Sequence, residues 1–244
     1  MSGVVSELEK LNLETAPVGD AVAVAAEEAQ GTGENKTKLP PANKRTGGKK
    51  MSHKTLSQFG EGRKVLAVAS QSAVKQVAGS IAHTSRESDP PVLSAVGPAS
   101  VNQAIKAVAV ARSYLEEDLI DLVVQVERGQ PGGDIKDLIL LNLKKVKLRV
   151  QPNVEYQNLK SAGKSGTSSL AGAIAKNIRE SKPVKITAVG QNPVFRAVDA
   201  VCFARKYLAD DGLDLEFQPE FTQITFDSGT QANAIQLTVI SHKI

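Results

Sequence analysis

The chain contains the same segment twice. Residues 69–122 and 162–215 align without a gap at a constant offset of 93, and 24 of the 54 aligned residues are identical. The tripeptide Arg-Glu-Ser, for example, occupies 86–88 and returns at 179–181. A repeat of this length is typical of a duplicated domain rather than of the short unit of a solenoid. The chain is therefore expected to fold as two related modules.

Each copy alternates short apolar runs, which predict strands, with segments whose apolar residues recur at helical spacing. The first copy predicts strands over 64–69, 92–96, 119–126 and 135–143, and helices over 74–85 and 100–115. The second copy predicts strands over 154–161, 185–189, 213–226 and 234–241, and helices over 167–179 and 193–208. The order is βαβαββ in both copies. This order predicts an α/β protein in which each module is an α+β sandwich.

The segment before the first copy differs in composition from the rest. Residues 1–34 carry one Lys and seven acidic residues, whereas residues 35–64 carry nine Lys or Arg and one Glu. With almost nothing to bury, we expect a disordered tail over 1–60, acidic and then basic. The basic stretch either adds phosphate contacts or a nuclear address, or serves only as a solubilising linker. The predicted domains are thus the tail 1–60, module 1 over 61–150 and module 2 over 151–244.

Composition excludes several classes of protein. The chain has no Trp and only 4% aromatic residues, so aliphatic side chains must fill its cores. No run approaches the ~20 apolar residues needed to cross a bilayer, and the N-terminus does not resemble a signal or transit peptide. The single Cys202 lies in an apolar run, which predicts a core position and fits a reducing compartment. We expect a cytoplasmic or nuclear protein whose net charge of +4 permits an anionic partner.

Specific residues in both copies resemble a known family. Residues 94–97, Ser-Ala-Val-Gly, followed by the Asn-Gln-Ala-rich segment 102–112, closely resemble the modules of the bacterial stage V sporulation protein S family. Residues 77–82 and 170–175 match the same family, and the second copy keeps its closing hairpin. That family is grouped with the Alba-like proteins, small βαβαββ modules that bind DNA or RNA, often as dimers. The resemblance implies two tandem Alba-like modules that form a pseudo-dimer within the chain.

The resemblance also implies where a nucleic acid would bind. Alba proteins carry a basic residue before the turn glycine, where this chain has Val96 and Val189, and lysines in the loop after the first strand. Module 2 keeps such lysines and module 1 does not, so module 2 is expected to lead the contact, with RNA favoured over DNA. The candidate contacts are Lys160, Lys164, Arg196, Arg205 and Lys206 in module 2, and Asn102, Lys106 and Arg112 in module 1.

Two of these assignments have structural alternatives. Lys164, in a loop rich in Gly and Ser, is either a phosphate contact or a solvated loop residue. Arg112 and Arg205 occupy the same site in the two copies, and such a recurring residue can equally hold a helix end to its neighbour.

Enzymatic readings find little support. The residues His53, His83 and His242 have no metal-ligand spacing with Cys, Asp or Glu. No nucleophile–base pair or acid pair recurs in both copies. The tripeptide 163–165, Gly-Lys-Ser, is not a P-loop because Asn158 occupies the position of that motif's first Gly. We expect no catalysis, no cofactor, no metal and no small-molecule substrate.

A second hypothesis of a different class is a protein-interaction or assembly module. It would use the apolar faces of the two later helices for docking or self-association: Val101, Ile105 and Val108 in module 1, and Val194, Val198 and Val201 in module 2. A stripe of cations, Lys145, Lys147 and Arg149, alternates with apolar residues after 138. On a strand these cations share one face, either as a charged sheet edge or as an anion-contacting stripe.

Overall fold

The computed structural model describes residues 63–129, 137–148, 154–163, 166–226 and 228–244. Module 1 consists of β1 (Val65–Val68), α2 (Val74–Glu87), β2 (Val92–Val96), α3 (Gly97–Leu115), β3 (Ile120–Arg128) and β4 (Leu138–Lys147). Module 2 consists of β5 (Gln157–Ser161), α4 (Thr167–Arg179), β6 (Val184–Ala188), α5 (Gln191–Leu208), β7 (Leu213–Thr225) and β8 (Gln231–Lys243). The predicted α/β class and the order βαβαββ in both copies are confirmed.

Some predictions fall outside these residues or differ in detail. The tail, Lys164 and Arg149 lie outside the described residues. The helix α3 begins at Gly97, three residues earlier than predicted, because Pro98 suits a first turn and Gly97 adopts a φ of +77°. Its counterpart Gly190 has a φ of +90° before α5. The described parts of both modules belong to one compact unit, and the predicted boundaries between modules stay a prediction.

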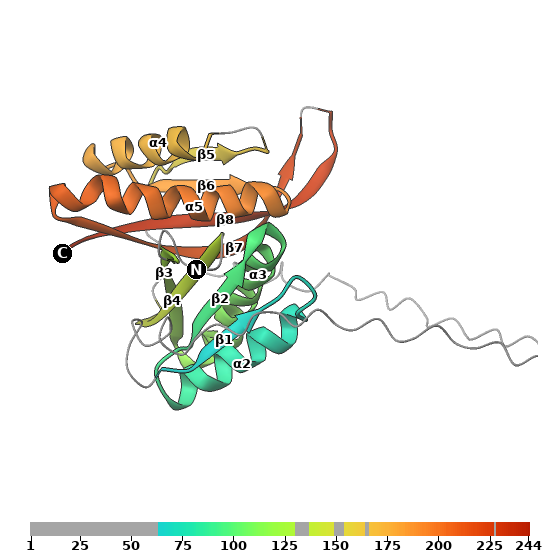
Figure 1. Cartoon of the computed structure of the whole chain (residues 1–244). Coiled ribbons are helices and arrows are strands. Elements are labelled where there is room, and N and C mark those ends of the chain that lie inside the picture. The colour runs from blue at the N-terminus through green and yellow to red at the C-terminus, as the bar shows by residue number, and fades with distance from the viewer. Residues whose placement is uncertain (1–62, 130–136, 149–153, 164–165, 227) are drawn as a thin grey trace, which may run out of the picture. The chain divides into compact units, whose positions relative to one another are not determined.

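The eight strands of the described residues form one sheet in the order β1-β2-β4-β3-β7-β8-β6-β5 (Figure 1). Read from either end, this order passes through equivalent strands of the two modules. The modules meet where β3 and β7 pair antiparallel at Val124 and Phe217, and these two residues are themselves 93 positions apart. The repeat therefore folds around an approximate twofold axis between Val124 and Phe217.

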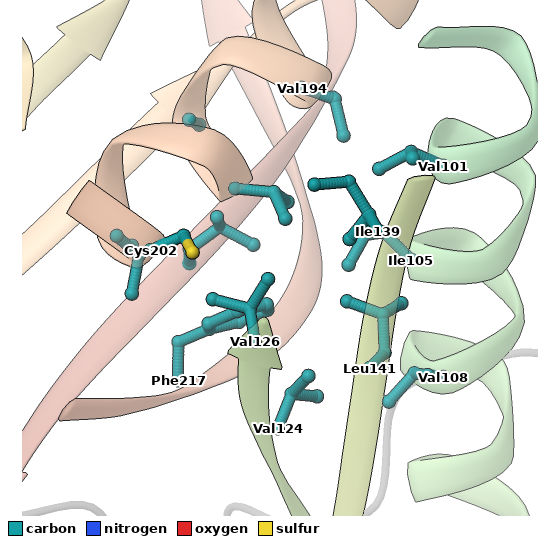
Figure 2. Close-up of a cluster of buried hydrophobic side chains, with 14 of the residues drawn as sticks. Val101, Ile105, Val108, Val124, Val126, Ile139, Leu141, Val194, Cys202 and Phe217 are labelled. Carbon is teal, nitrogen blue, oxygen red and sulfur yellow. The ribbon is translucent and has the colours of Figure 1, made fainter. Parts of the chain in front are cut away.

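The helices α3 and α5 pack against each other over this junction and enclose a core shared by both modules. Val101 and its counterpart Val194 point toward one another between the two helices, above Val126, Ile139 and Phe217 (Figure 2). Cys202 lies in the same core, as its apolar surroundings predicted. No helix in the described ranges is long and apolar enough to cross a membrane.

This shared core occupies the two helix faces that the assembly hypothesis requires. Every residue named for that hypothesis is at most 1% exposed: Val101, Ile105, Val108, Val194, Val198 and Val201. The periodicity correctly identified apolar faces, but their partner is the other module of the same chain. The assembly hypothesis in this form is therefore wrong, because neither face is available to a second protein.

At one pair of equivalent positions, Leu119 and Gly212, the backbone has the same left-handed conformation but the residue type differs. A short turn follows α3 and α5, and ends at Leu119 (φ +56°) and Gly212 (φ +69°) respectively. The surrounding hydrogen bonds are the same: each amide binds the carbonyl three residues earlier at 3.0 Å. Only glycine adopts this left-handed conformation without cost.

We therefore expect Leu119→Gly to stabilise the protein by about 0.5–1 kcal/mol, because relief of the left-handed strain exceeds the added chain entropy. Leu119 is 71% exposed, so little packing is lost. The mirror substitution Gly212→Leu should destabilise by about 1 kcal/mol, although a Cβ atom there meets nothing within 4 Å. Urea unfolding of both variants measures the two effects, and shifts in the same direction would contradict the argument.

Candidate nucleic-acid interface

A reciprocal polar network flanks the junction of β3 and β7. On one side, Arg112 of α3 binds Asp121 through Nε at 2.7 Å and Nη2 at 3.0 Å, and its Nη1 donates to the carbonyl of Pro219 in module 2 at 2.8 Å. On the other side, Arg205 of α5 binds Asp214 in the same bidentate manner and donates to the carbonyl of Val126 in module 1. Each arginine therefore joins its own module to the other.

Two glutamines complete the network across the junction. Gln218 donates to Asp121 at 2.8 Å, and Gln125 donates to Asp214 at 2.6 Å. Each pair of contacting residues in one half has its counterpart 93 positions away in the other half. The network thus has the isologous form of a homodimer interface, in which the same contact occurs twice.

The network holds the Asp214 carboxylate in the charged form. Burial alone would raise the pKa of Asp214, but hydrogen bonds from Arg205, the Leu215 amide and Gln125, together with the Arg205 charge, lower that pKa to about 2. Arg205 is itself partly buried, which would lower its pKa, yet the Asp214 carboxylate raises it. At neutral pH this half of the network is therefore a fully ionised pair.

These contacts indicate a structural role for Arg112 and Arg205. Their side chains are only 16% and 18% exposed, and each is saturated by a carboxylate and a carbonyl. The alternative in which the recurring arginine is structural fits this geometry. Direct phosphate contact by the two arginines stays a prediction, and it would require them to leave partners that hold the junction between the modules together.

A second pair of arginines recurs without crossing the junction. Arg86 binds Asp118 and the Tyr114 carbonyl, and Arg179 binds Asp211 and the Tyr207 carbonyl. These side chains are 45% and 50% exposed, and both partners lie in the same module. They fasten α2 to the end of α3, and α4 to the end of α5.

The remaining candidates on the helix side gather around the twofold axis. Asn102 and Lys106 lie on the N-terminal half of α3, and Phe195 and Arg196 on the N-terminal half of α5, all partly exposed. We call these four residues the axial surface, because they lie on the same halves of α3 and α5 as the facing pair Val101 and Val194 (Figure 2). The N-termini of both helices point here, and their partial positive charge favours anions.

Lys160 and Lys206 lie on other parts of module 2. Leu159 packs on the core and Ser161 bonds to the Pro193 carbonyl at 2.8 Å, so Lys160 between them points to the opposite face of the sheet, near the beginning of α5. Lys206 is exposed and lies 5.7 Å from the Phe203 ring centroid. The structure thus places Asn102, Lys106 and Arg196 on the two later helices, Lys160 on the opposite face of the sheet, and Lys206 near the C-terminal end of α5.

The lysines of the cation stripe lie on β4, which has a neighbouring strand on both sides along only part of its length. β4 lies between β2 and β3, but its pairing with β2 ends at Asn142, so Lys145 and Lys147 pair with β3 alone. Both lysines are exposed. The strand as a whole is not a sheet edge, and the two interpretations of its cations stay predictions.

The far end of the β7–β8 hairpin was not predicted from the sequence to be a binding element. Strand pairing continues from Phe221–Ile235 to Thr225–Gln231, beyond the last residues that pair with β6. We call the described residues of this segment, 221–226 and 228–235, the arm; it projects from the sheet (Figure 1). Phe221 is 51% and Phe226 45% exposed. In the sequence, the signal for this element was a pair of Phe residues in a segment rich in Gln, Asn and Thr.

The described residues offer little for catalysis. A hollow of about 680 Å³ is lined among others by Asp121, Tyr156, Lys182 and Glu216. Three of these already pair with other side chains: Asp121 with Arg112, Lys182 with Glu180, and Glu216 with Lys144 at 2.6 Å. Within the described ranges, no group of three His, Cys, Asp or Glu could hold a metal ion.

Two segments of the chain match a protein-family model. Residues 64–127 and 157–242 each match the model described as stage V sporulation protein S (SpoVS). The first matched segment runs from β1 into β3 of module 1 and does not include β4, and the second runs from β5 into β8 of module 2. Together the two segments cover more than half of the chain.

Proposed function

Since the chain belongs to the stage V sporulation protein S family, with two copies of that family's domain in tandem, we propose that it binds single-stranded nucleic acid, RNA in preference to DNA. The proposal includes no catalytic step and no cofactor. It places the protein in the cytoplasm or the nucleus and makes RNA its main partner.

The observation that carries the proposal is the axial surface with the adjoining arm. Lys106 and Arg196 supply cations from different modules, and two helix N-termini converge between them. Phe221 and Phe226 offer flat apolar groups to bases, and the amides of Gln and Asn offer donors and acceptors to base edges. Stacking on exposed rings requires unpaired bases, which favours single strands and RNA loops.

Fluorescence anisotropy of a labelled mixed-sequence RNA tests this function. We expect binding at low salt that weakens linearly in a plot of log affinity against log salt. The double variant Lys160→Ala/Lys164→Ala should reduce the slope by about 1–2, because each lost phosphate contact removes about one counterion. Lys176→Ala, which removes an exposed lysine of α4 far from the axial surface, is the matched control and should leave the slope unchanged.

The same titration is run with single-stranded DNA and with both duplexes. Tighter binding of single strands, and of RNA over DNA, supports the proposal. Absence of binding to every probe at low salt contradicts it, and equal binding of duplexes would contradict the role given to the exposed rings.

A further inference from the structure

The twofold arrangement creates two equivalent junctions, in each of which the end of a central strand meets the second helix of the other module. In one, Arg128 at the end of β3 meets Asp199 on α5. The counterparts of Arg128 and Asp199, 93 positions away, are Phe221 on β7 and Lys106 on α3. The two copies thus carry opposite charges at the same place on the helix.

At the junction between β3 and α5, side chains of these two elements bind each other. Arg128 Nε lies 2.6 Å from Asp199 Oδ1, and Nη2 lies 3.2 Å from Oδ2. The guanidinium also lies 5.6 Å from the Phe203 ring centroid, within cation–π range. Asp199 is 4% exposed, and its carboxylate takes up the charge of Arg128, which is therefore not available to a phosphate. We call Arg128, Asp199 and Phe203 the closed junction.

The equivalent junction lacks this closure. The hydrogen bonds Arg112 to Pro219 and Arg205 to Val126 show that α3 meets β7 in the same register as α5 meets β3. Lys106 therefore stands opposite Phe221 as Asp199 stands opposite Arg128. Among the described residues Lys106 has no ion pair or hydrogen bond, and Phe221 is half exposed. We call Lys106, Asn102 and Phe221 the open junction.

On the basis of the proposed function, we propose that one chain binds one single strand, at the open junction only, and that the Arg128–Asp199 pair excludes a strand from the equivalent place. Lys106 contacts a phosphate, and the Phe221 ring stacks on a base beside it. This combination of a cation and a neighbouring ring is the usual form of a single-strand site. The bound strand therefore touches both modules, with the cation from module 1 and the ring from module 2.

The test uses the full chain and a labelled oligoribonucleotide of about 12 nucleotides, long enough for one such site. Lys106→Asp gives this position of α3 the charge of its counterpart Asp199, and we expect affinity to fall at least about tenfold. Phe221→Ala should weaken binding by about fivefold or more through lost stacking. Lys75→Asp makes the same charge change at an exposed site on α2 and should change affinity by less than about twofold.

The closed junction provides the opposite test. Arg128→Ala should leave affinity within about twofold, because this arginine neutralises Asp199 rather than a phosphate. The double change Asp199→Lys with Arg128→Phe rebuilds the open junction's charge and ring, and should raise the stoichiometry from one oligonucleotide per chain to two. Thermal unfolding confirms that each variant is folded.

The outcomes separate this inference from the proposed function. If the unmodified chain binds no probe at low salt, both fail. If it binds but Lys106→Asp has no effect, or Arg128→Ala weakens binding as strongly as Lys106→Asp, the function stands and the asymmetry is overturned. Two equal sites on the unmodified chain would likewise overturn it.

Discussion

Replacing Arg205 with alanine is expected to destabilise the protein by about 3 kcal/mol, and Arg112→Ala by a similar amount. Each substitution leaves a carboxylate of the junction, Asp214 or Asp121, without its bidentate partner in a largely buried position. It also leaves a carbonyl of the opposite module without its donor. Denaturant unfolding at neutral pH measures the loss.

Arg179→Ala and Arg86→Ala are the matched controls. They remove the same side chain from the same type of contact, an aspartate and a carbonyl, but at half-exposed sites within one module. Such pairs contribute below about 1 kcal/mol, because water and salt screen them. Equal losses from the two sets of arginines would show that the position at the junction confers no special stability.

Phe217→Ala should cost about 4 kcal/mol, the largest effect of any single substitution considered. Its ring is fully buried at the twofold axis, where it pairs with Val124 and packs below α3 and α5 (Figure 2). Truncation removes apolar contacts with both modules at once and leaves a cavity between them. The midpoint and free energy of urea unfolding give the size of the loss.

Phe221→Ala, four residues further along the same strand, is the control and should cost less than about 1 kcal/mol because half of its ring is already exposed. Should Phe217→Ala fail to fold, Phe217→Leu tests the same site at a cost of about 1–2 kcal/mol. A loss from Phe217→Ala no greater than that from Phe221→Ala would contradict the shared core.

The fold could be predicted from the sequence because the repeat supplied the same pattern twice. Helical spacing in one copy, such as Val101, Ala104, Ile105 and Val108, was checked by its counterpart, so chance periodicity was easy to reject. The resemblance implied a pseudo-dimer within the chain, but the pairing of β3 with β7 was not predicted. No local pattern in either strand predicts that Val124 pairs with Phe217, because the two residues lie 93 positions apart in the chain.

The candidate site was harder to predict, because a cation's role depends on its partners. Arg205 and Arg196 look equally suitable in the sequence, yet Asp214 and the Val126 carbonyl engage the first inside the junction. The recurrence of Arg112 and Arg205 was the signal, since a residue kept at an interface is needed on both sides. The equivalent positions Lys106 and Asp199 carry opposite charges. The sequence alone does not show that Arg128 pairs with Asp199, so the consequence of this difference for binding could not be predicted.

Fusion of the two modules changes the rules that an interface of this kind obeys. In a homodimer the partners must find each other, so stability falls on dilution, and any substitution appears on both sides at once. Here a covalent linker holds the partners together, so unfolding is independent of protein concentration. A lysine on one helix and an aspartate at its counterpart are impossible in identical subunits. The continuous sheet through Val124 and Phe217 therefore permits each half to acquire its own chemistry while keeping a common core.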